Sequence, residues 1–561
     1  MSSSDNNNKM NRPNSIPFSP SIWKDYLMSN VSNNSLMDMK ENNDDSEIVI
    51  LKKEVKKKIL ELDYVENPLE TLEFIDSIQR LGVSYYFENQ IEVVLKNICN
   101  KFHEENNDDD DLYVVALRFR LVRQQGYYMS CDVFNKFTNN EGKFKESLFN
   151  DIRGMLSLYE ASQLRVHGEK ILDDALIFTT NNLESVAKTS KLSSHISNQV
   201  NHALKNPIRK SLQRRQARHY MSLYHQISSH NEHLLALAIL DFNLLQKLYH
   251  KELSDLTRWW KKFDYERRQS FSRERIMDCY FWTFGVFFEA ETSHIRLLMS
   301  KLIALLTLVD DIYDNFGTLQ ELHLLTEAIQ RWDMCLIDQL PEYIQPCYKE
   351  ILNLYTEIGE FTKDKSYCLN YAKKGFQELV KGYFEEAKWL HQKHNPTLDE
   401  YMPIALVTAA SPLLIAISFI GMPNVVTKDS MNWIFSHPQP KSVRTLSIVG
   451  RVLNDIGFYQ WRERRTEKVD FSAVNCYIKQ YGVEEEEAIQ RLKEQVSDSW
   501  KDLNEECLYP NNMNIPMPLL MRVLDLVRMN NELYREGDGF TREAFIKDLI
   551  DSLIINPYIQ Q

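Results

Sequence analysis

Residues such as Leu, Ile, Lys, Glu and Gln recur at helical spacing in most windows of the chain. Apolar positions three and four residues apart lie on one face of a helix, so each segment of this kind can bury one side. The 16 glycines and 17 prolines are few for a protein with many strands and tight turns. The pattern therefore predicts an all-α fold.

The pattern also changes along the chain and indicates how the 561 residues are divided. Residues 1–20 are polar, and we expect them to be disordered. From residue 48 to about residue 221, apolar segments alternate with short polar breaks. After the basic, proline-containing segment 205–218, the helical segments become longer and more apolar. We therefore predict a disordered segment at 1–20, a non-catalytic helical domain at 21–230 and a catalytic domain at 231–561.

Composition and charge exclude several classes of protein. A net charge of −13 argues against a general nucleic-acid binder, although metal ions could still mediate binding of an anionic substrate. The eight cysteines are scattered without a CxxC motif, which predicts reduced thiols in a cytoplasmic protein, not disulfides or a zinc site. No secretion signal and no apolar run of about 18 residues is visible, so we expect a soluble chain without a membrane span.

The strongest chemical feature is the acidic motif DDIYD at residues 310–314. It follows the apolar run 302–309, which is predicted to be one buried helix. On that helix Asp310 and Asp314 lie one turn apart and face the same way, with β-carbons roughly 5–6 Å apart. Two such carboxylates repel one another unless a cation lies between them, and oxygen ligands on a rigid helix suit Mg²⁺. A solvated helix face is the commoner origin of the motif alone, but the buried helix before it favours metal ligands at a cavity rim.

Two arginines precede this motif, and the first of them, Arg273, lies 37 residues before Asp310. Arg273 and Arg275 flank a single glutamate, and two guanidiniums can clamp a diphosphate through paired N–H donors. Trp282 follows them closely. In a pocket its ring would stabilise a carbocation by cation–π attraction, whereas in a core it would simply pack.

A third motif, RVLNDI, occupies residues 451–456. Arg451 lies one helical turn before Asn454 and Asp455, so one of these two side chains could bind a metal while Arg451 reaches a phosphate. Each of the three motifs is weak alone. Their occurrence in this order within one helical domain is a specific signal.

From about residue 12 to the C-terminus, the chain resembles plant terpene synthases of the cytosolic sesquiterpene type. Arg12-Pro13 followed by Trp23 is similar to the family's N-terminal signature in the form without a plastid transit peptide, and residues 117–127 resemble another family stretch. Residues 408–411 match a helix break that lines the family's pocket. The segment YREGDGFT at 534–541 resembles the loop that caps it, with Phe540 where the family more often has Tyr.

The resemblance implies an α-barrel-like N-terminal domain and a class I terpenoid synthase α-bundle at the C-terminus. It implies a monomeric cytoplasmic lyase that uses three Mg²⁺ ions, replaceable by Mn²⁺, to ionise farnesyl diphosphate, cyclise the carbocation and release diphosphate. The implied catalytic residues are Arg273, Arg275, Trp282, Arg451, Asp538 and Phe540. The implied substrate-binding residues are Arg273, Asp310, Asp314, Arg451, Asn454 and Thr408, and the implied metal ligands are Asp310, Asp311, Asp314, Asn454 and Asp455.

The second metal motif departs from the family pattern (N/D)Dxx(S/T)xxxE. The Ser/Thr position holds Phe458, the Glu position holds Arg462, and Glu463 comes one residue late. On an α-helix Glu463 points away from the face of Asn454, so it could serve only if the helix carries a π-bulge. The alternatives are a site with fewer protein ligands, in which Arg462 contacts the diphosphate, and weak or lost activity.

Three rival functions stay open at this point. Geranyl diphosphate could be the substrate, because the choice of farnesyl diphosphate rests on the N-terminal signature and not on pocket contacts. A chain-elongating prenyltransferase would carry two complete aspartate-rich motifs, and the chain has one DDxxD. A non-catalytic helical scaffold that lost its second metal site would explain Phe458 and Arg462.

Overall fold

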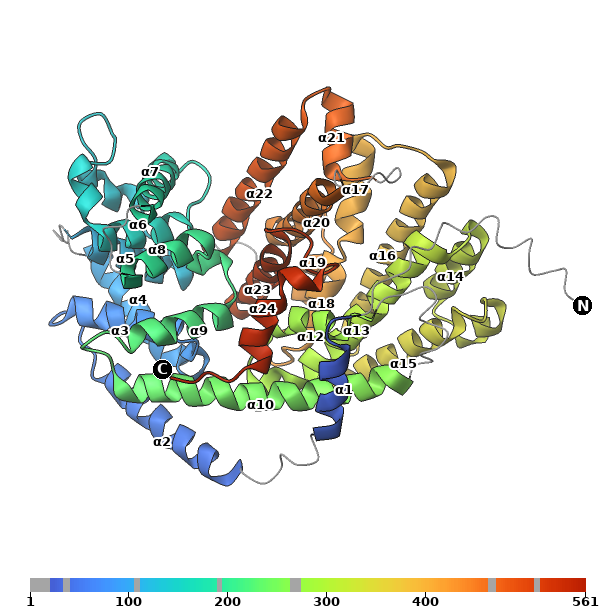
Figure 1. Ribbon diagram of the computed structural model, residues 1–561, viewed down its shortest axis with the longest axis horizontal. Coiled ribbons are helices and arrows are strands. Elements are labelled where there is room, and N and C mark those ends of the chain that lie inside the picture. The colour runs from blue at the N-terminus through green and yellow to red at the C-terminus, as the bar shows by residue number, and fades with distance from the viewer. Residues whose placement is uncertain are drawn as a thin grey trace, which may run out of the picture. The chain divides into compact units, whose positions relative to one another are not determined.

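The computed structural model describes residues 21–33, 41–104, 111–188, 194–262, 274–462, 471–508 and 515–560. Figure 1 shows helices connected by loops, and the described residues contain no β-strand, only two isolated bridges. The all-α prediction is therefore confirmed. The chain separates into two compact units, each assembled from segments that are distant in sequence. The domain limits predicted from the sequence stay a prediction.

Unit 2 contains Met39–Gln246, Trp500–Met517 and Asp551–Gln561. Its α-helices are amphipathic, and their apolar faces pack against one another in the interior of the unit. They are α2 (Glu41–Leu60), α3 (Pro68–Arg80), α4 (Glu88–Glu104), α5 (Leu112–Gln124), α6 (Ile152–Ser162), α7 (Lys170–Ala187), α8 (Ser194–Lys205), α9 (Gln213–Tyr224) and the first half of α10 (Glu232–Lys262).

Unit 1 contains Met1–Asp38, Lys247–Ser499 and Pro518–Ile550. All the site residues predicted from the sequence fall in its segments. Its helices are α1 (Lys24–Asn33), α12 (Ile276–Phe284), α13 (Ser293–Asp311), α14 (Leu319–Arg331), α15 (Gln345–Phe361), α16 (Tyr367–Gln392), α17 (Leu398–Thr408), α18 (Ser411–Ile420), α19 (Lys428–Ile434), α20 (Lys441–Arg462), α21 (Ala473–Tyr481), α22 (Glu485–Leu508, which ends in unit 2), α23 (Met517–Tyr534) and α24 (Lys547–Ile550).

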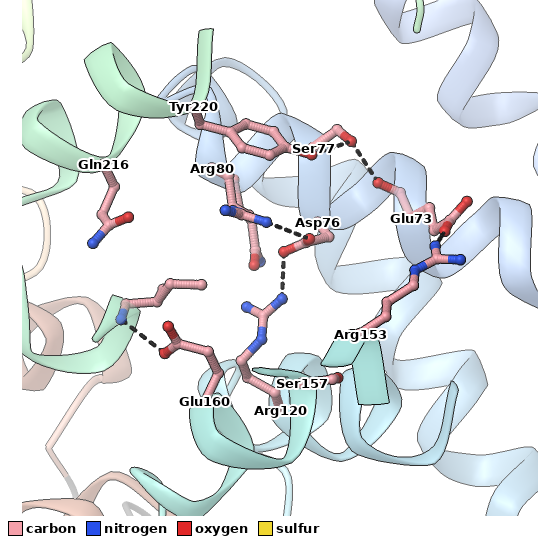
Figure 2. A network of polar contacts seen from close by, with 12 residues as sticks. Glu73, Asp76, Ser77, Arg80, Arg120, Arg153, Ser157, Glu160, Gln216 and Tyr220 are labelled. Carbon is pink, nitrogen blue, oxygen red and sulfur yellow. Dashed lines mark hydrogen bonds and ion pairs between the residues drawn. The ribbon is translucent and has the colours of Figure 1, made fainter. Parts of the chain in front are cut away.

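A network of buried charges holds unit 2 together (Figure 2). Asp76 of α3 lies between Arg80 and Arg120, and Arg120 belongs to the stretch 117–127. Arg123, from the same stretch, is buried and donates to the carboxylate of Glu169, with one bond of 2.8 Å. Buried charges are tolerated only when they are paired and hydrogen-bonded, so these arginines have a structural role in unit 2.

Glu160 of α6 lies in the same network, where its carboxylate accepts the N–H of Ile208 at 2.8 Å. Burial raises the pKa of Glu160 to about 7, against the opposing charge of Arg120. Because this folded-state pKa exceeds the unfolded value, the folded state binds the proton more tightly, and stability is lost as the pH rises from about 4.5 to about 7. The loss amounts to at most about 3 kcal/mol.

We expect Glu160→Gln to remove this pH dependence, because the neutral amide can still accept the Ile208 N–H. The variant should melt several degrees above the wild type near pH 8, and the difference should shrink as the pH falls towards about 5.5. Thermal melting at several pH values measures this. Glu184→Gln, at an exposed position of α7, is the control. A pH-independent difference between Glu160→Gln and the wild type would contradict the assignment.

In unit 1, α16, α17, α18 and α20 lie side by side (Figure 1), and α13 packs against α18. Among the described residues, Leu398–Ile420 is long and apolar enough to cross a membrane, but 67% of its best window is buried inside the protein. The segment is also broken into α17 and α18 at Ala410, whose φ of 59° is left-handed. A buried, broken core segment of this kind is weak evidence for a membrane span.

Candidate active site

The acidic motif begins at the C-terminal end of α13 and continues into a π-helical turn, Ile312–Phe316. The Gly317 N–H donates to the Ile312 carbonyl at 2.8 Å, the i→i+5 bond that defines such a turn. The prediction of one regular α-helix through Asp314 was therefore wrong. Tyr313 points into the core, where its hydroxyl lies 2.7 Å from that of Thr326, and the wider turn accommodates this buried side chain.

The motif's carboxylates lie in distinct environments. Asp310 is half-buried, Asp311 is buried and Asp314 is exposed. Burial raises the pKa of Asp310, while Arg275 and Arg451 both oppose the rise, so Asp310 senses both guanidiniums. The pKa of Asp314 is raised further, because the surrounding protein restricts solvation of even this accessible group and because Asp310 and other nearby carboxylates repel its charge.

A glutamate and a tyrosine on α16 join the motif, and sequence reasoning missed both. The pKa of Glu386 is raised to about 7, because burial and the charges of Asp310 and Asp455 outweigh the opposing effects of Arg451 and the Thr408 hydroxyl. Tyr383, one turn earlier, acts on Asp310 through its hydroxyl, which lowers that carboxyl's pKa. The only signal in the sequence is an acid three residues after a tyrosine on an amphipathic helix, which is too common to be specific.

Arg275 is the residue that precedes α12 and is 8% exposed. Its guanidinium lies 3.9 Å from an oxygen of Asp311 and 5.7 Å from the centre of the Phe540 ring. Its pKa is raised: burial acts to lower it, but the charges of Asp311, Asp310 and Asp538 outweigh that effect. Its Nε is buried without a hydrogen-bond partner in the described part of the chain. Such a group fits an anionic ligand.

Arg273 and Trp282 are the other two side chains predicted upstream of the acidic motif. Arg273 lies outside the described residues, so its predicted role stays a prediction. Trp282 is buried on α12, where all residues from Ile276 to Phe284 are buried.

The third motif lies on α20 and brings Arg451 towards α17. Arg451 donates to the Thr408 hydroxyl at 3.0 Å and to the Ala405 carbonyl at 3.3 Å. Its guanidinium lies 3.8 Å from Asp455. The pKa of Arg451 is raised well above its usual value, because Tyr401, Asp455 and Glu386 outweigh the effect of burial.

The two candidate ligands of this motif differ. Asp455 is 4% exposed and accepts from the Tyr401 hydroxyl at 2.8 Å and from the Ala473 N–H at 2.7 Å. These bonds tie α20 to α17 and to the start of α21, which favours a positioning role. Asn454, the neighbouring residue, is half-buried. Of the two, Asn454 is therefore the better candidate for a ligand.

The residues that depart from the family pattern at the end of this motif lie only partly within the described residues. α20 is α-helical without a π-turn up to Arg462. A π-bulge that would turn the next residue towards Asn454 is therefore not present within α20, and Glu463 itself lies outside the described residues. Phe458 is half-buried and on the described part of α20.

The capping loop follows α23 and lies against α20. A β-carbon at Gly457 would lie 3.0 Å from backbone atoms of Gly537 and Asp538, so only glycine allows this close approach. Asp538 is 6% exposed and accepts the Thr541 N–H at 2.9 Å. Its charge also acts on Arg275, and Tyr534 at the end of α23 responds to both groups. Asp538 therefore belongs to the same electrostatic cluster as the acidic motif.

This cluster fits divalent cations held jointly with a ligand. The charges of Asp310 and Glu386 raise the pKa of Asp314, and the charge of Asp310 raises that of Glu386, as expected for neighbouring carboxylates without a cation between them. Among the described residues, no group of three or more His, Cys, Asp or Glu is close enough to hold a metal alone. Mg²⁺ characteristically completes its shell with water and phosphate oxygens. The donor set and the unsatisfied Arg275 Nε therefore suit metal ions bound together with a phosphate.

Comparison with known proteins agrees with this geometry. The family described as "Terpene synthase family, metal binding domain" matches residues 261–502, and "Terpene synthase, N-terminal domain" matches residues 22–204. A (-)-germacrene D synthase from Vitis vinifera is 48% identical over 546 residues, covering 96% of this chain and 95% of that protein. A probable sesquiterpene synthase from Santalum murrayanum is 44% identical over 548 residues, 97% and 95% of the two chains.

A solved structure is also similar. Isoprene synthase from grey poplar leaves (Populus x canescens), in complex with three Mg²⁺ ions and dimethylallyl-S-thiolodiphosphate, superimposes with a TM-score of 0.83 at 31% identity. The match covers 92% of this chain and 98% of that one. The resemblance predicted from the motifs is thus confirmed.

Proposed function

The chain belongs to the terpene synthase family, and from that premise we propose that it is a sesquiterpene synthase that ionises farnesyl diphosphate and cyclises the resulting cation. The family's domain binds a divalent metal. We further propose that the metal is Mg²⁺, that three ions bind and that Mn²⁺ can replace them. The reaction belongs to the carbon–oxygen lyases that act on phosphates.

One observation carries this proposal: Asp310 lies within the electrostatic reach of both Arg275 and Arg451. An alternation of acidic and basic groups is what a metal-bound diphosphate needs, since carboxylates hold cations and guanidiniums hold phosphate oxygens. In the reaction, the bond between the allylic carbon and the diphosphate oxygen breaks, and both electrons leave with the diphosphate. Arg275 and Arg451 stabilise that developing charge.

When bound, the metal ions would neutralise the diphosphate and improve it as a leaving group. Aromatic side chains then protect the cation. Phe540, whose ring centre lies 5.7 Å from the Arg275 guanidinium, supplies apolar, polarisable surface beside a charged group, and we propose the same role for the buried Trp282. Exclusion of water by the loop around Asp538 lets the cation cyclise before it loses a proton or captures water.

Incubation of the purified protein with farnesyl diphosphate and Mg²⁺, followed by analysis of volatile products, tests the proposal. We expect a cyclised C15 hydrocarbon or alcohol. A parallel incubation with geranyl diphosphate tests the monoterpene alternative, and a longer prenyl diphosphate would indicate chain elongation. An absence of product from either substrate would support the non-catalytic scaffold.

The departure at Arg462 gives a prediction of its own. Because α20 is regular up to this residue, position 462 lies on the face of Asn454, two helical turns later. We expect Arg462→Glu to restore a carboxylate there and to lower the half-saturating Mg²⁺ concentration by about tenfold. A titration of activity against Mg²⁺ measures this, with Gln460→Glu, at an exposed position on another face, as control. An unchanged titration would count against our interpretation of the register.

Two wider expectations complete the proposal. We propose that the protein acts as a monomer and in the cytoplasm. None of the eight cysteines forms a disulfide in the structure, which supports a reducing compartment.

A further inference from the structure

The break between α17 and α18 places a threonine among three helices of unit 1. Thr408 is the last residue of α17, and the left-handed Ala410 turns the chain into α18 two residues later. The Thr408 side chain is 4% exposed. Its neighbours come from α16 and α20, both of which pack against α17. A buried hydroxyl at this point needs hydrogen-bond partners, and the partners it has are charged groups of the site.

The hydroxyl of Thr408 lies between Glu386 and Arg451. It donates to Glu386 Oε1 at 2.8 Å, and it accepts from Arg451 Nη2 at 3.0 Å. A hydroxyl has one proton and two lone pairs, and a guanidinium can only donate. One lone pair of the Thr408 hydroxyl therefore accepts the Arg451 N–H, and the hydroxyl proton is donated to Glu386. The Ala405 carbonyl, at 3.2 Å, is a second and longer acceptor of that proton.

The methyl group of Thr408 explains why the hydroxyl has this orientation. A β-carbon at Gly382 of α16 would lie 2.8 Å from Thr408 Cγ2, so the methyl group occupies the space that the missing side chain leaves. Branching at the β-carbon makes χ1 stiff, so fixing the methyl group also fixes the hydroxyl. The hydroxyl is thereby directed to the gap between the carboxylate of Glu386 and the guanidinium of Arg451.

This bridge keeps both charged groups available. Arg451 has five N–H donors, and two of them are engaged by Thr408 and the Ala405 carbonyl in the described part of the chain. A direct bidentate pair between Arg451 and Glu386 would occupy two N–H donors on one edge of the guanidinium and both oxygens of the carboxylate. The Thr408 hydroxyl between them holds both side chains in place and uses only one N–H donor of Arg451 and one carboxylate oxygen of Glu386.

We propose that Thr408 is a positioning residue: its hydroxyl holds Arg451 in the orientation that receives the diphosphate and holds Glu386 beside the acidic motif. This inference rests on the proposed function, because it assumes that a diphosphate is the ligand. Thr408 acts through its two neighbours and need not touch the reacting atoms.

The test compares four variants. Thr408→Val keeps the methyl group and the volume but removes the hydroxyl, whereas Thr408→Ser keeps the hydroxyl and removes the methyl group. Thr408→Ala lacks both. Thr257→Val is the matched control, since Thr257 is 2% exposed, lies in the same unit and donates within its own helix to Leu253 at 2.7 Å. Turnover of farnesyl diphosphate and binding of inorganic pyrophosphate with Mg²⁺, by calorimetry, are measured for each.

We expect Thr408→Val to raise KM and to weaken pyrophosphate binding by about tenfold or more, the loss of one hydrogen bond to a charged group. For Thr408→Ser, KM and pyrophosphate affinity should stay within about threefold of the wild-type values. For Thr257→Val, both should equal the wild-type values. Equal losses in the serine and valine variants, or none in valine, would overturn the proposal. If the valine variant does not fold, the serine and alanine variants decide, because they differ by the hydroxyl alone.

The proposed function and the proposed role of Thr408 would be contradicted by different results. If the wild type makes no terpene but binds pyrophosphate with Mg²⁺, the proposed function fails and the binding data still decide the role of Thr408. If the wild type neither turns over farnesyl diphosphate nor binds pyrophosphate, both proposals are wrong.

Discussion

Replacement of Asp310 by asparagine is expected to lower kcat/KM for farnesyl diphosphate by about a thousandfold, with the melting temperature little changed. The amide keeps the size of the side chain but loses its charge and has an NH₂ donor in place of one acceptor oxygen. Arg275 and Arg451 both act on the charge of Asp310, so the variant would lose the proposed metal ligand and one of the negative charges that the two guanidiniums sense. Losses of about 10²–10³ follow the removal of one preorganised group that stabilises a transition-state charge, and a lost metal ligand should reach the upper end.

Steady-state kinetics over a range of Mg²⁺ concentrations measures this effect. Asp255→Asn is the matched control, because Asp255 is on the exposed surface of α10 and pairs with Arg258. An exposed ion pair contributes little, so the control should keep its activity within about twofold. If Asp310→Asn kept full activity and an unchanged Mg²⁺ requirement, the acidic motif would not be the metal site.

Replacement of Arg275 is expected to produce the second large effect. Arg275→Met should lower kcat/KM by about 10²–10³, because it removes the guanidinium that is surrounded by the carboxylates of Asp311, Asp310 and Asp538. Its Nε has no hydrogen-bond partner in the described part of the chain, so we expect the paired N–H donors, as well as the charge, to contact the ligand. Arg275→Lys keeps the charge without the paired donors, so it should recover only part of the activity.

Kinetics with farnesyl diphosphate and inhibition by pyrophosphate distinguish these variants. Arg331→Met is the control, since Arg331 is exposed on α14 and pairs with Glu327 at 3.3 Å. Equal activity in the lysine variant and the wild type would mean that Arg275 contributes charge alone. Normal activity in the methionine variant would exclude Arg275 from the diphosphate site.

The sequence predicted the class of fold and the main charged groups of the site for a physical reason. Helical periodicity is a local property, so the run 302–309 could be interpreted without knowledge of its neighbours. Carboxylates at the end of a buried helix must point to solvent or to a cavity. For this reason Asp310 could be linked to Arg275 and Arg451 before any contact was known.

The groups that sequence reasoning missed depend on contacts between distant segments. Nothing within α16 distinguishes Glu386 from an ordinary solvated acid, and its raised pKa results from Asp310, Arg451 and the protein around it. The π-turn after α13 likewise reflects where Tyr313 packs. Asp455 stays a predicted metal ligand, but its bonds to Tyr401 and Ala473 could not be foreseen, because both partners are remote in sequence.

Buried charge in unit 2 illustrates the same limit. The segment 205–218 is basic, and its composition served only to place a domain boundary after it. In the structure Arg209 and Arg214 are buried, the first bonded to Asn504 at 3.0 Å and the second paired with Asp241 at 2.9 Å. A charge pattern does not reveal which charges have partners, because those partners are supplied by other helices.

The most direct measurement of the central claim is the amount of pyrophosphate released per terpene formed, with and without a chelator. The claim is that Asp310, Arg275 and Arg451 surround one metal-dependent site that detaches diphosphate from an isoprenoid. We predict equimolar pyrophosphate and C15 product in Mg²⁺, neither product in excess EDTA, and recovery when Mg²⁺ is restored. Turnover that survives EDTA, or a product that keeps its diphosphate, would contradict it.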